Sequence, residues 1–244
     1  MIIIVFFITH WYISLFFQSF FHHRYAAHHQ FSMSRRWEKF FFISSFISQG
    51  SSYISPYAYG IMHRLHHIHT DTENDPHSPA NHPRFWRMMI ETRNSYFNIY
   101  SGKIQAEEKF KKDLPQWKAF DAFAHNWITR MGWMIFYTLF YLRFATGWWQ
   151  FIFLPLTIIM GTLQGAVVNW WAHKFGYVNY SVKNTSKNII PVDLFFWGES
   201  YHNNHHHNPG RPNNAHRWFE FDPGYLVLRL MHKTKIIRLN NYTV

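Results

Sequence analysis

The N-terminal stretch of this chain, residues 1–21, contains no Lys, Arg, Asp or Glu. About 20 apolar residues in succession are enough to cross a lipid bilayer as a helix. A signal peptide would need a basic start and a small-residue cleavage site, and neither is present. The stretch therefore predicts a membrane span, which restricts the chain to folds that satisfy every backbone polar group inside a bilayer.

A second apolar block covers residues 131–172 and is too long for one span. It has a natural break at residues 143–147, beside a Trp pair at 148–149 that is typical of a membrane interface. We expect two further spans, residues 130–146 and 148–171, joined there as a hairpin.

The intervening segment, residues 37–62, is aromatic but interrupted by Ser, Gln, Gly and Pro. Such groups are costly where they face lipid, so we expect an interfacial or re-entrant helix that does not cross. With three spans, Arg143 is the only one of 24 Lys and Arg residues on the far side. This asymmetry predicts that residues 22–129 and 172–244 lie on the cytoplasmic side.

The expected fold is therefore a single all-α integral membrane domain, residues 1–244. It has about three transmembrane helices, interfacial helices and a cytoplasmic cap that is rich in histidine. A soluble aromatic-rich protein is the alternative. The net charge of +11 does not indicate nucleic acid, since the compact basic run is limited to residues 109–112. The absence of Cys excludes disulfides, iron–sulfur clusters and thiolate-bound zinc from this chain.

The 19 histidines are clustered rather than scattered. One cluster, at residues 22–29, holds an H-x4-H pair just past the first predicted span. Residues 63–67 and 202–206 each form an H-x2-H-H box, and Asn169 precedes His173 by four residues. Positions i, i+3 and i+4 share a helix face, so each box presents three imidazoles to one side. The two adjacent histidines of a box straddle that face and can reach two neighbouring metal ions.

Neutral imidazole is a common ligand for iron, zinc, copper and nickel. A mononuclear zinc site needs three or four ligands, whereas the clusters supply nine, which predicts two metal ions with four or five nitrogens each. The candidate ligands are His23, His28, His63, His66, His67, His173, His202, His205 and His206. Carboxylate-bridged bundles use two Glu-x-x-His motifs, and residues 199–202 form the single match here.

The other histidines are interpreted as surface or hydrogen-bonding residues. His22, His29, His69, His77 and His207 flank the boxes, and we expect hydrogen bonding from them. Carboxylates near the boxes are expected to orient the imidazoles, although each also fits a turn or a helix cap. These outer partners are Asp71, Asp75 and Glu199.

The order H-x4-H, H-x2-H-H, N-x3-H, H-x2-H-H resembles the membrane fatty-acyl desaturases of the acyl-CoA (stearoyl-CoA) Δ9 type. The residues around the second box (63–77), the third box (197–206) and the later segment 218–223 strengthen the resemblance. It implies that the nine histidines bind two iron ions, with Asn169 acting through a bound water. It also implies an O2-dependent reaction that inserts a cis double bond into a saturated acyl chain, with acyl-CoA the expected substrate.

The chain departs from this family in one feature and leaves others open. Family members usually have two spans before the first box in a four-span fold, and one fits here. No haem-binding cytochrome b5 segment is fused, so we expect a separate electron donor such as ferredoxin, rubredoxin or cytochrome b5. A related di-iron hydroxylase is the main alternative, and a His-rich transporter or sensor is a second. Acyl chain length, double-bond position, the acyl carrier and the oligomeric state stay open.

Overall fold

The computed structural model describes residues 1–82 and 84–240 of the chain. The helical elements of its first half are α1 (Ile2–Phe17), η1 (Gln18–Ala27), α2 (Arg35–Gln49), η2 (Gly50–Ser52), α3 (Pro56–His69), α4 (Phe85–Tyr100) and α5 (Glu108–Lys111). Those of its second half are α6 (Lys118–His125), α7 (Trp127–Phe144), η3 (Trp148–Ile152), α8 (Phe153–Ile158), α9 (Met160–Ala172), α10 (His202–His207) and α11 (Pro223–Lys233). Strands β1 (Phe31–Met33) and β2 (Ile237–Leu239) pair antiparallel, with Phe31 opposite Leu239.

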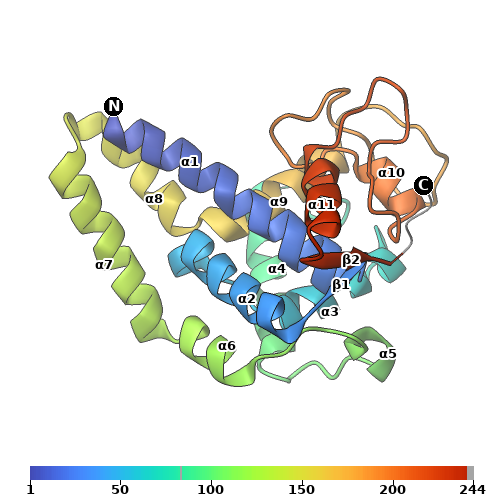
Figure 1. The fold of residues 1–244 in the computed structure, drawn as a ribbon, viewed down its shortest axis with the longest axis horizontal. Coiled ribbons are helices and arrows are strands. Elements are labelled where there is room, and N and C mark those ends of the chain that lie inside the picture. The colour runs from blue at the N-terminus through green and yellow to red at the C-terminus, as the bar shows by residue number, and fades with distance from the viewer. Residues whose placement is uncertain (83, 241–244) are drawn as a thin grey trace.

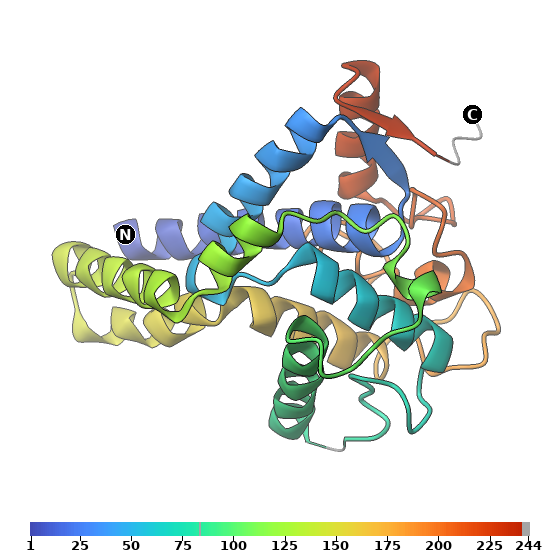
Figure 2. The same cartoon turned by 90° about the horizontal axis from the view of Figure 1, so that it is seen from below.

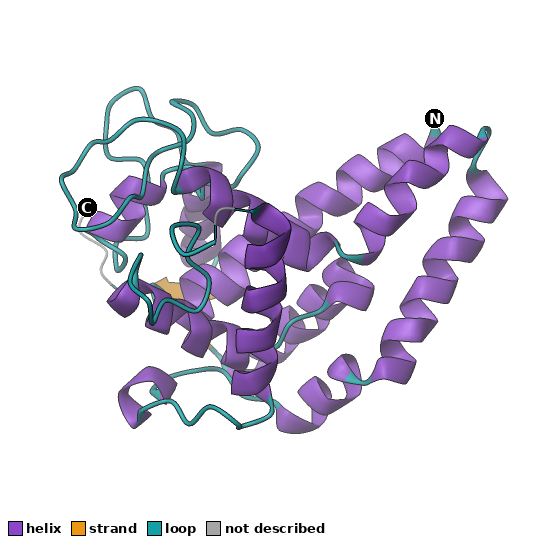
Figure 3. Ribbon diagram, turned by 180° about the vertical axis from the view of Figure 1, so that it is seen from behind, coloured by secondary structure: helices purple, strands orange, loops and turns teal. Residues whose placement is uncertain are grey.

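The long helices lie together at one end of the molecule and the long loops gather at the other. The N-terminus lies beside the connection between α7 and η3, while α10 and the C-terminal loops occupy the opposite end (Figure 1). Figure 3 shows the same separation of helices from loops. Seen from below, α2 and α11 lie on one side of α1, and α4 lies on the other (Figure 2).

Local sequence signals set where several helices begin. The Asn126 side chain caps α7 by accepting a hydrogen bond from the backbone N–H of Ile128, at 2.8 Å. Asp222 caps α11 in the same way through Tyr225, and Pro223 occupies the first helical position. Pro56 likewise begins α3, the helix that carries the second histidine box.

Two apolar cores hold these elements together. One joins η1, α2, α11 and both strands through aromatic and aliphatic side chains, among them Phe20, Phe31 and Leu228. The other packs α3 against α4 through Ile61 and Tyr96. Both cores lie beside helices that carry histidine boxes, so packing determines where the boxes meet.

Among the described residues, one helix is long and apolar enough to cross a membrane, namely residues 2–27. The helices at 148–158 and 160–172 meet the same criterion only as a pair, and they are bent by 77°. Helix α7 does not meet it, since Arg130 and Arg143 near its ends lower its mean hydropathy. Large apolar side chains are nevertheless exposed along α1, α2 and α7, as lipid contact requires. The count of three spans stays a prediction.

The predicted continuous helix at 148–171 was wrong, because the chain breaks at Ile159. Pro155 cannot donate a backbone hydrogen bond, which weakens the helix one turn before the break. Side chains of η2 then satisfy the freed backbone groups. Ser51 Oγ donates to Ile158 O at 2.7 Å, and Ser52 Oγ accepts from Gly161 N at 2.8 Å. This is how irregular backbone is tolerated inside a protein core.

The first helix also differs from the prediction, which ended it at residue 21. The chain continues without interruption as η1, a π-helix, as far as Ala27. The first histidine cluster therefore begins inside this helix rather than past its end. π-Helical segments are rare and are frequently found at functional sites.

Candidate metal centre

The H-x4-H pair is brought together by the wider turn of η1. Residues five apart lie on different faces of an α-helix, because each residue advances the helix by about 100°. In η1 the backbone N–H of His28 donates to the carbonyl of His23 at 3.1 Å, which closes a five-residue turn. The two imidazole rings consequently lie 4.8 Å apart between centroids.

Five imidazoles from three helices, η1 with its C-terminal cap residue, α3 and α10, form what we call the first histidine group. One nitrogen from each lies within 4.8 Å of the others. Neighbouring Nε2 atoms are 2.9 Å apart for His63 and His28, 3.0 Å for His67 and His63, and 3.1 Å for His23 and His205. The members are His23, His28, His63, His67 and His205.

Four further imidazoles form the second histidine group, which meets the same distance criterion. His202 Nε2 lies 3.2 Å from His173 Nε2 and 3.1 Å from His206 Nε2. His66 completes the group. The two groups are adjacent, since the rings of His67 and His206 stack at 4.4 Å.

All nine predicted ligands are thus brought together, in sets of five and four. Each H-x2-H-H box is divided between the sets rather than presenting all its imidazoles to one. His63 and His67 belong to the first group and His66 to the second. The adjacent histidines at i+3 and i+4 therefore face neighbouring sites, as their spacing allows.

The chemistry of these groups fits metal ions. Burial lowers the pKa of His63, His66 and His202 well below its ordinary value, so the imidazoles are neutral and can donate a lone pair. His66 Nε2 is buried and has no hydrogen-bond partner within the described residues. A converging set of neutral nitrogens, one of them unpaired, is costly unless a cation lies between them.

Three carboxylates contact the outer nitrogens of these imidazoles. Glu199 Oε2 lies 2.7 Å from His23 Nδ1, and both Asp75 oxygens lie 3.0 Å from His66 Nδ1. Asp71 Oδ1 lies 3.6 Å from His173 Nδ1, which also contacts Thr185 Oγ1 at 3.0 Å. Each of the three carboxylates expected from the sequence thus lies where it would fix the ring orientation of a metal ligand, and that role stays a prediction.

Glu199 is also held by the helix that carries the first box. Ser19 Oγ donates to Glu199 Oε1 at 2.6 Å, and Arg24 Nε lies 3.6 Å from the same oxygen. Burial by itself would raise the pKa of Glu199, but the adjacent His23 and Arg24 hold it below the ordinary value. The carboxylate is therefore ionised and can accept a hydrogen bond from the Nδ1–H group of His23.

Glu199→Gln is expected to weaken metal binding by about 10- to 100-fold, because the neutral amide no longer stabilises the His23 imidazole electrostatically. Chelator competition followed by iron analysis of the purified protein measures this change. Ser19→Ala is the matched control, since it removes one hydrogen bond to the carboxylate and retains its charge. Equal losses from both variants would show that Glu199 only supports local packing.

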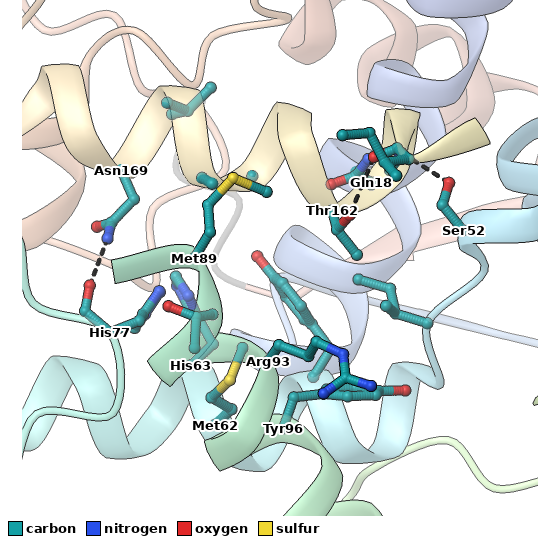
Figure 4. A pocket seen from close by; sticks show the side chains of 18 of the residues that line it. Gln18, Ser52, Met62, His63, His77, Met89, Arg93, Tyr96, Thr162 and Asn169 are labelled. Carbon is teal, nitrogen blue, oxygen red and sulfur yellow. Dashed lines mark hydrogen bonds between the residues drawn. The ribbon is translucent and has the colours of Figure 1, made fainter. Parts of the chain in front are cut away.

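A cavity of about 590 Å³ reaches both histidine groups. His23 and His63 of the first group and His202 of the second line it, and His63 lies toward the same end as His77 and Asn169 (Figure 4). The remaining wall is mostly apolar and includes Met88, Met89, Ile158 and Val168. The helix break also contributes, since Gly161 lines the cavity, and Ser52 and Thr162 lie at the end away from Asn169 (Figure 4).

Asn169 lies at the histidine end of this cavity. Its Nδ2 donates to the carbonyl of His77 at 2.7 Å (Figure 4). Its Oδ1 is buried without a hydrogen-bond partner in the described parts of the chain. That oxygen is free to accept from a bound water, the role that the resemblance implied.

Sequence reasoning missed two residues of this region. His77 was expected to hydrogen-bond, but its Nε2 is buried and unpaired in the described structure, and its ring lies 4.4 Å from that of His66. Its position two residues after Asp75, the partner of His66, could have indicated that it lies beside the histidine groups. No sequence pattern indicated the role of Arg24, because its partner Asp222 lies 198 residues away.

The sequence profile of the fatty acid desaturase family matches residues 1–218. The chain belongs to this family. This desaturase-family chain is 26% identical over 215 residues to Delta-9 acyl-lipid desaturase 1 of Arabidopsis thaliana, covering 86% of the chain and 66% of that relative. It is 28% identical over 215 residues to an sn-1 stearoyl-lipid 9-desaturase of Synechocystis sp., covering 86% of the chain and 62% of the relative. It thus spans about two thirds of the length of these curated relatives.

Proposed function

We propose that this protein is an O2-dependent fatty-acyl desaturase that inserts a cis double bond through a histidine-bound di-iron centre. The observation that supports this proposal is the meeting of the two histidine groups at one end of an apolar cavity. A cavity with apolar walls and a reactive end suits a long substrate that has no polar group near the reacting carbons. Family membership and the names of the relatives point the same way.

The iron ions, when bound, would supply the oxidising power drawn from O2 that removal of hydrogen from an unactivated methylene requires. The overall reaction consumes a saturated –CH2–CH2– unit, one O2, two electrons and two protons, and yields –CH=CH– and two waters. The chain itself binds the acyl chain, excludes water with its apolar wall and orients the ligands. His23, His66 and His173 are held through Glu199, Asp75 and Asp71 respectively.

The acyl carrier is the part of the substrate that the cavity does not define. The sequence motifs resemble those of acyl-CoA desaturases, whereas the names of both relatives specify acyl chains carried on lipids. We favour a lipid-borne chain on the strength of these names. We further propose that the protein is an integral membrane protein with its histidine boxes on the cytoplasmic side.

Mass spectrometry of total fatty acids from cells that express the chain tests the proposal. A new monounsaturated acid, absent with an inactive variant, supports desaturation and locates the double bond. Supplying labelled acyl-CoA or labelled glycerolipid to isolated membranes then identifies the carrier. A hydroxy acid would indicate the related hydroxylase instead. No new lipid, with iron bound and a working donor supplied, would contradict acyl chemistry and favour a metal-binding membrane protein.

Gly165→Leu is expected to reduce desaturation of long chains at least several-fold, because the new side chain enters the cavity. Gly165 lines the cavity, and a Cβ added there would lie 3.6 Å from Gln18 Oε1, an ordinary contact. Gly165→Ala is therefore the matched control and is expected to keep activity. Iron content should be unchanged in both variants. If Gly165→Leu and Gly165→Ala are equally active, on long acyl chains as well as on short ones, the substrate does not occupy this cavity.

A further inference from the structure

The second histidine group approaches the surface beside an exposed cluster of aromatic and cationic side chains. Its member His206 is only half-buried, whereas the other three are buried. The next residue, His207, is exposed and stacks on Tyr180 with 3.9 Å between ring centroids and 3° between planes. An exposed ring stack adjoins a candidate metal ligand at this place.

Cations surround this stack. Arg217 lies over the Tyr180 ring at 5.6 Å, and Tyr180 Oη contacts His216 Nδ1 at 3.1 Å. Burial, together with the positive charge of Arg211, lowers the pKa of His216 to about 4. At neutral pH the positive charge of this surface therefore comes from Arg211 and Arg217, while the neighbouring carboxylate of Glu220 is buried. Neither arginine takes part in an ion pair within the described residues.

Trp218 adds an apolar anchor. Its side chain is 95% exposed, the most exposed large apolar side chain in the described part of the chain. Exposed Trp and Arg together are typical of the residues that dominate protein–protein binding energy. We call Tyr180, His207, Arg211, Arg217 and Trp218 the cationic aromatic patch. The loops that carry it lie at the same end of the molecule as α10, away from α7 (Figure 1).

We propose that the cationic aromatic patch docks a separate acidic protein that carries one electron, and that the Tyr180–His207 stack carries the electron toward His206. This inference rests on the proposed function, whose reaction consumes two electrons that a redox carrier must supply. Each docking oxidises the carrier by one electron and breaks no bond, so two successive dockings supply both electrons. A net charge of +11 also steers an acidic partner toward the protein.

Binding of acidic carriers to the purified, iron-loaded protein tests the docking surface without any need for activity. Ferredoxin, rubredoxin and soluble cytochrome b5 are the probes, measured by biolayer interferometry at low and high salt. We expect at least one carrier to bind. Arg211→Glu and Arg217→Glu should each weaken that binding about tenfold at low salt and less at high salt. Trp218→Ala should weaken it about tenfold at both.

Lys103→Glu is the matched control, since Lys103 is an exposed cation outside the patch. Equal effects of Lys103→Glu and Arg217→Glu would show that net charge alone attracts the carrier and would overturn the proposal. The chain has no cysteine, so Trp218→Cys gives a single labelling site. Quenching of a fluorophore there by brominated lipids would place residue 218 in the bilayer and would also overturn it.

The electron route has its own pair of variants. Tyr180→Leu removes the ring stack with His207, whereas Tyr180→Phe removes only the hydroxyl. We expect iron reduction by the bound carrier to slow several-fold in the Leu variant alone, with dithionite reduction unchanged. Equal rates in both variants would contradict the route.

Product formed with dithionite, while no carrier binds, would reject this inference and leave the proposed function standing. No product with dithionite and iron would reject the proposed function itself.

Discussion

His205→Ala is expected to remove one metal ion and reduce desaturation at least 100-fold. His205 Nε2 lies 3.1 Å from His23 Nε2 and 3.0 Å from His67 Nε2, so it occupies the middle of the first histidine group. Changing an outer partner of a metal ligand commonly costs 10- to 100-fold, and loss of a ligand itself should cost more. Iron analysis of the purified protein and the fatty-acid assay measure the two effects.

His29→Asn is the control for this experiment. His29 is exposed, follows the candidate ligand His28 directly and has a backbone φ of 48°, a conformation that Asn tolerates well. It should keep both iron and activity. Retention of two iron ions by His205→Ala, at wild-type affinity, would contradict the assignment of His205 as a ligand.

Arg24→Leu is expected to lower the free energy of unfolding by ~3–5 kcal/mol. The Arg24 guanidinium is buried and donates to both oxygens of Asp222, at 3.0 and 2.9 Å. It also donates to the carbonyls of Trp197 and Pro212, at 2.8 and 2.7 Å. Without Arg24 the carboxylate of Asp222 is left buried and unpaired, and the segment that carries the third box loses its attachment to η1.

Denaturant or thermal unfolding in detergent micelles measures this loss, and reduced iron content should accompany it. The matched control is Arg35→Leu. The Arg35 side chain is exposed, and its partner Glu38 keeps the hydrogen bond from Tyr25 Oη, so removal of Arg35 should change the unfolding free energy by about 0–1 kcal/mol. Equal destabilisation by the two variants would show that burial of Arg24 does not increase its contribution to the free energy of unfolding.

The sequence by itself determined which residues form the candidate site. Imidazole is a metal ligand wherever it is neutral, and the H-x2-H-H spacing already places three rings along one side of a short helix. The nine histidines, Asn169 and the three carboxylates could therefore be named from composition, spacing and a family resemblance. The apolar character of residues 1–21 likewise followed from local chemistry alone.

Only the tertiary structure decided how these residues are shared and what lies beside them. His63 and His66 belong to different groups because imidazoles from distant segments lie beside them, His28 next to His63 and His173 next to His66. The break at Ile159 depends on Ser51 and Ser52, more than 100 residues earlier. The bond between Arg24 and Asp222 and the apolar cavity also arise from contacts between distant segments. Such contacts form only when packing brings the segments together, so the sequence pattern of either segment does not contain them.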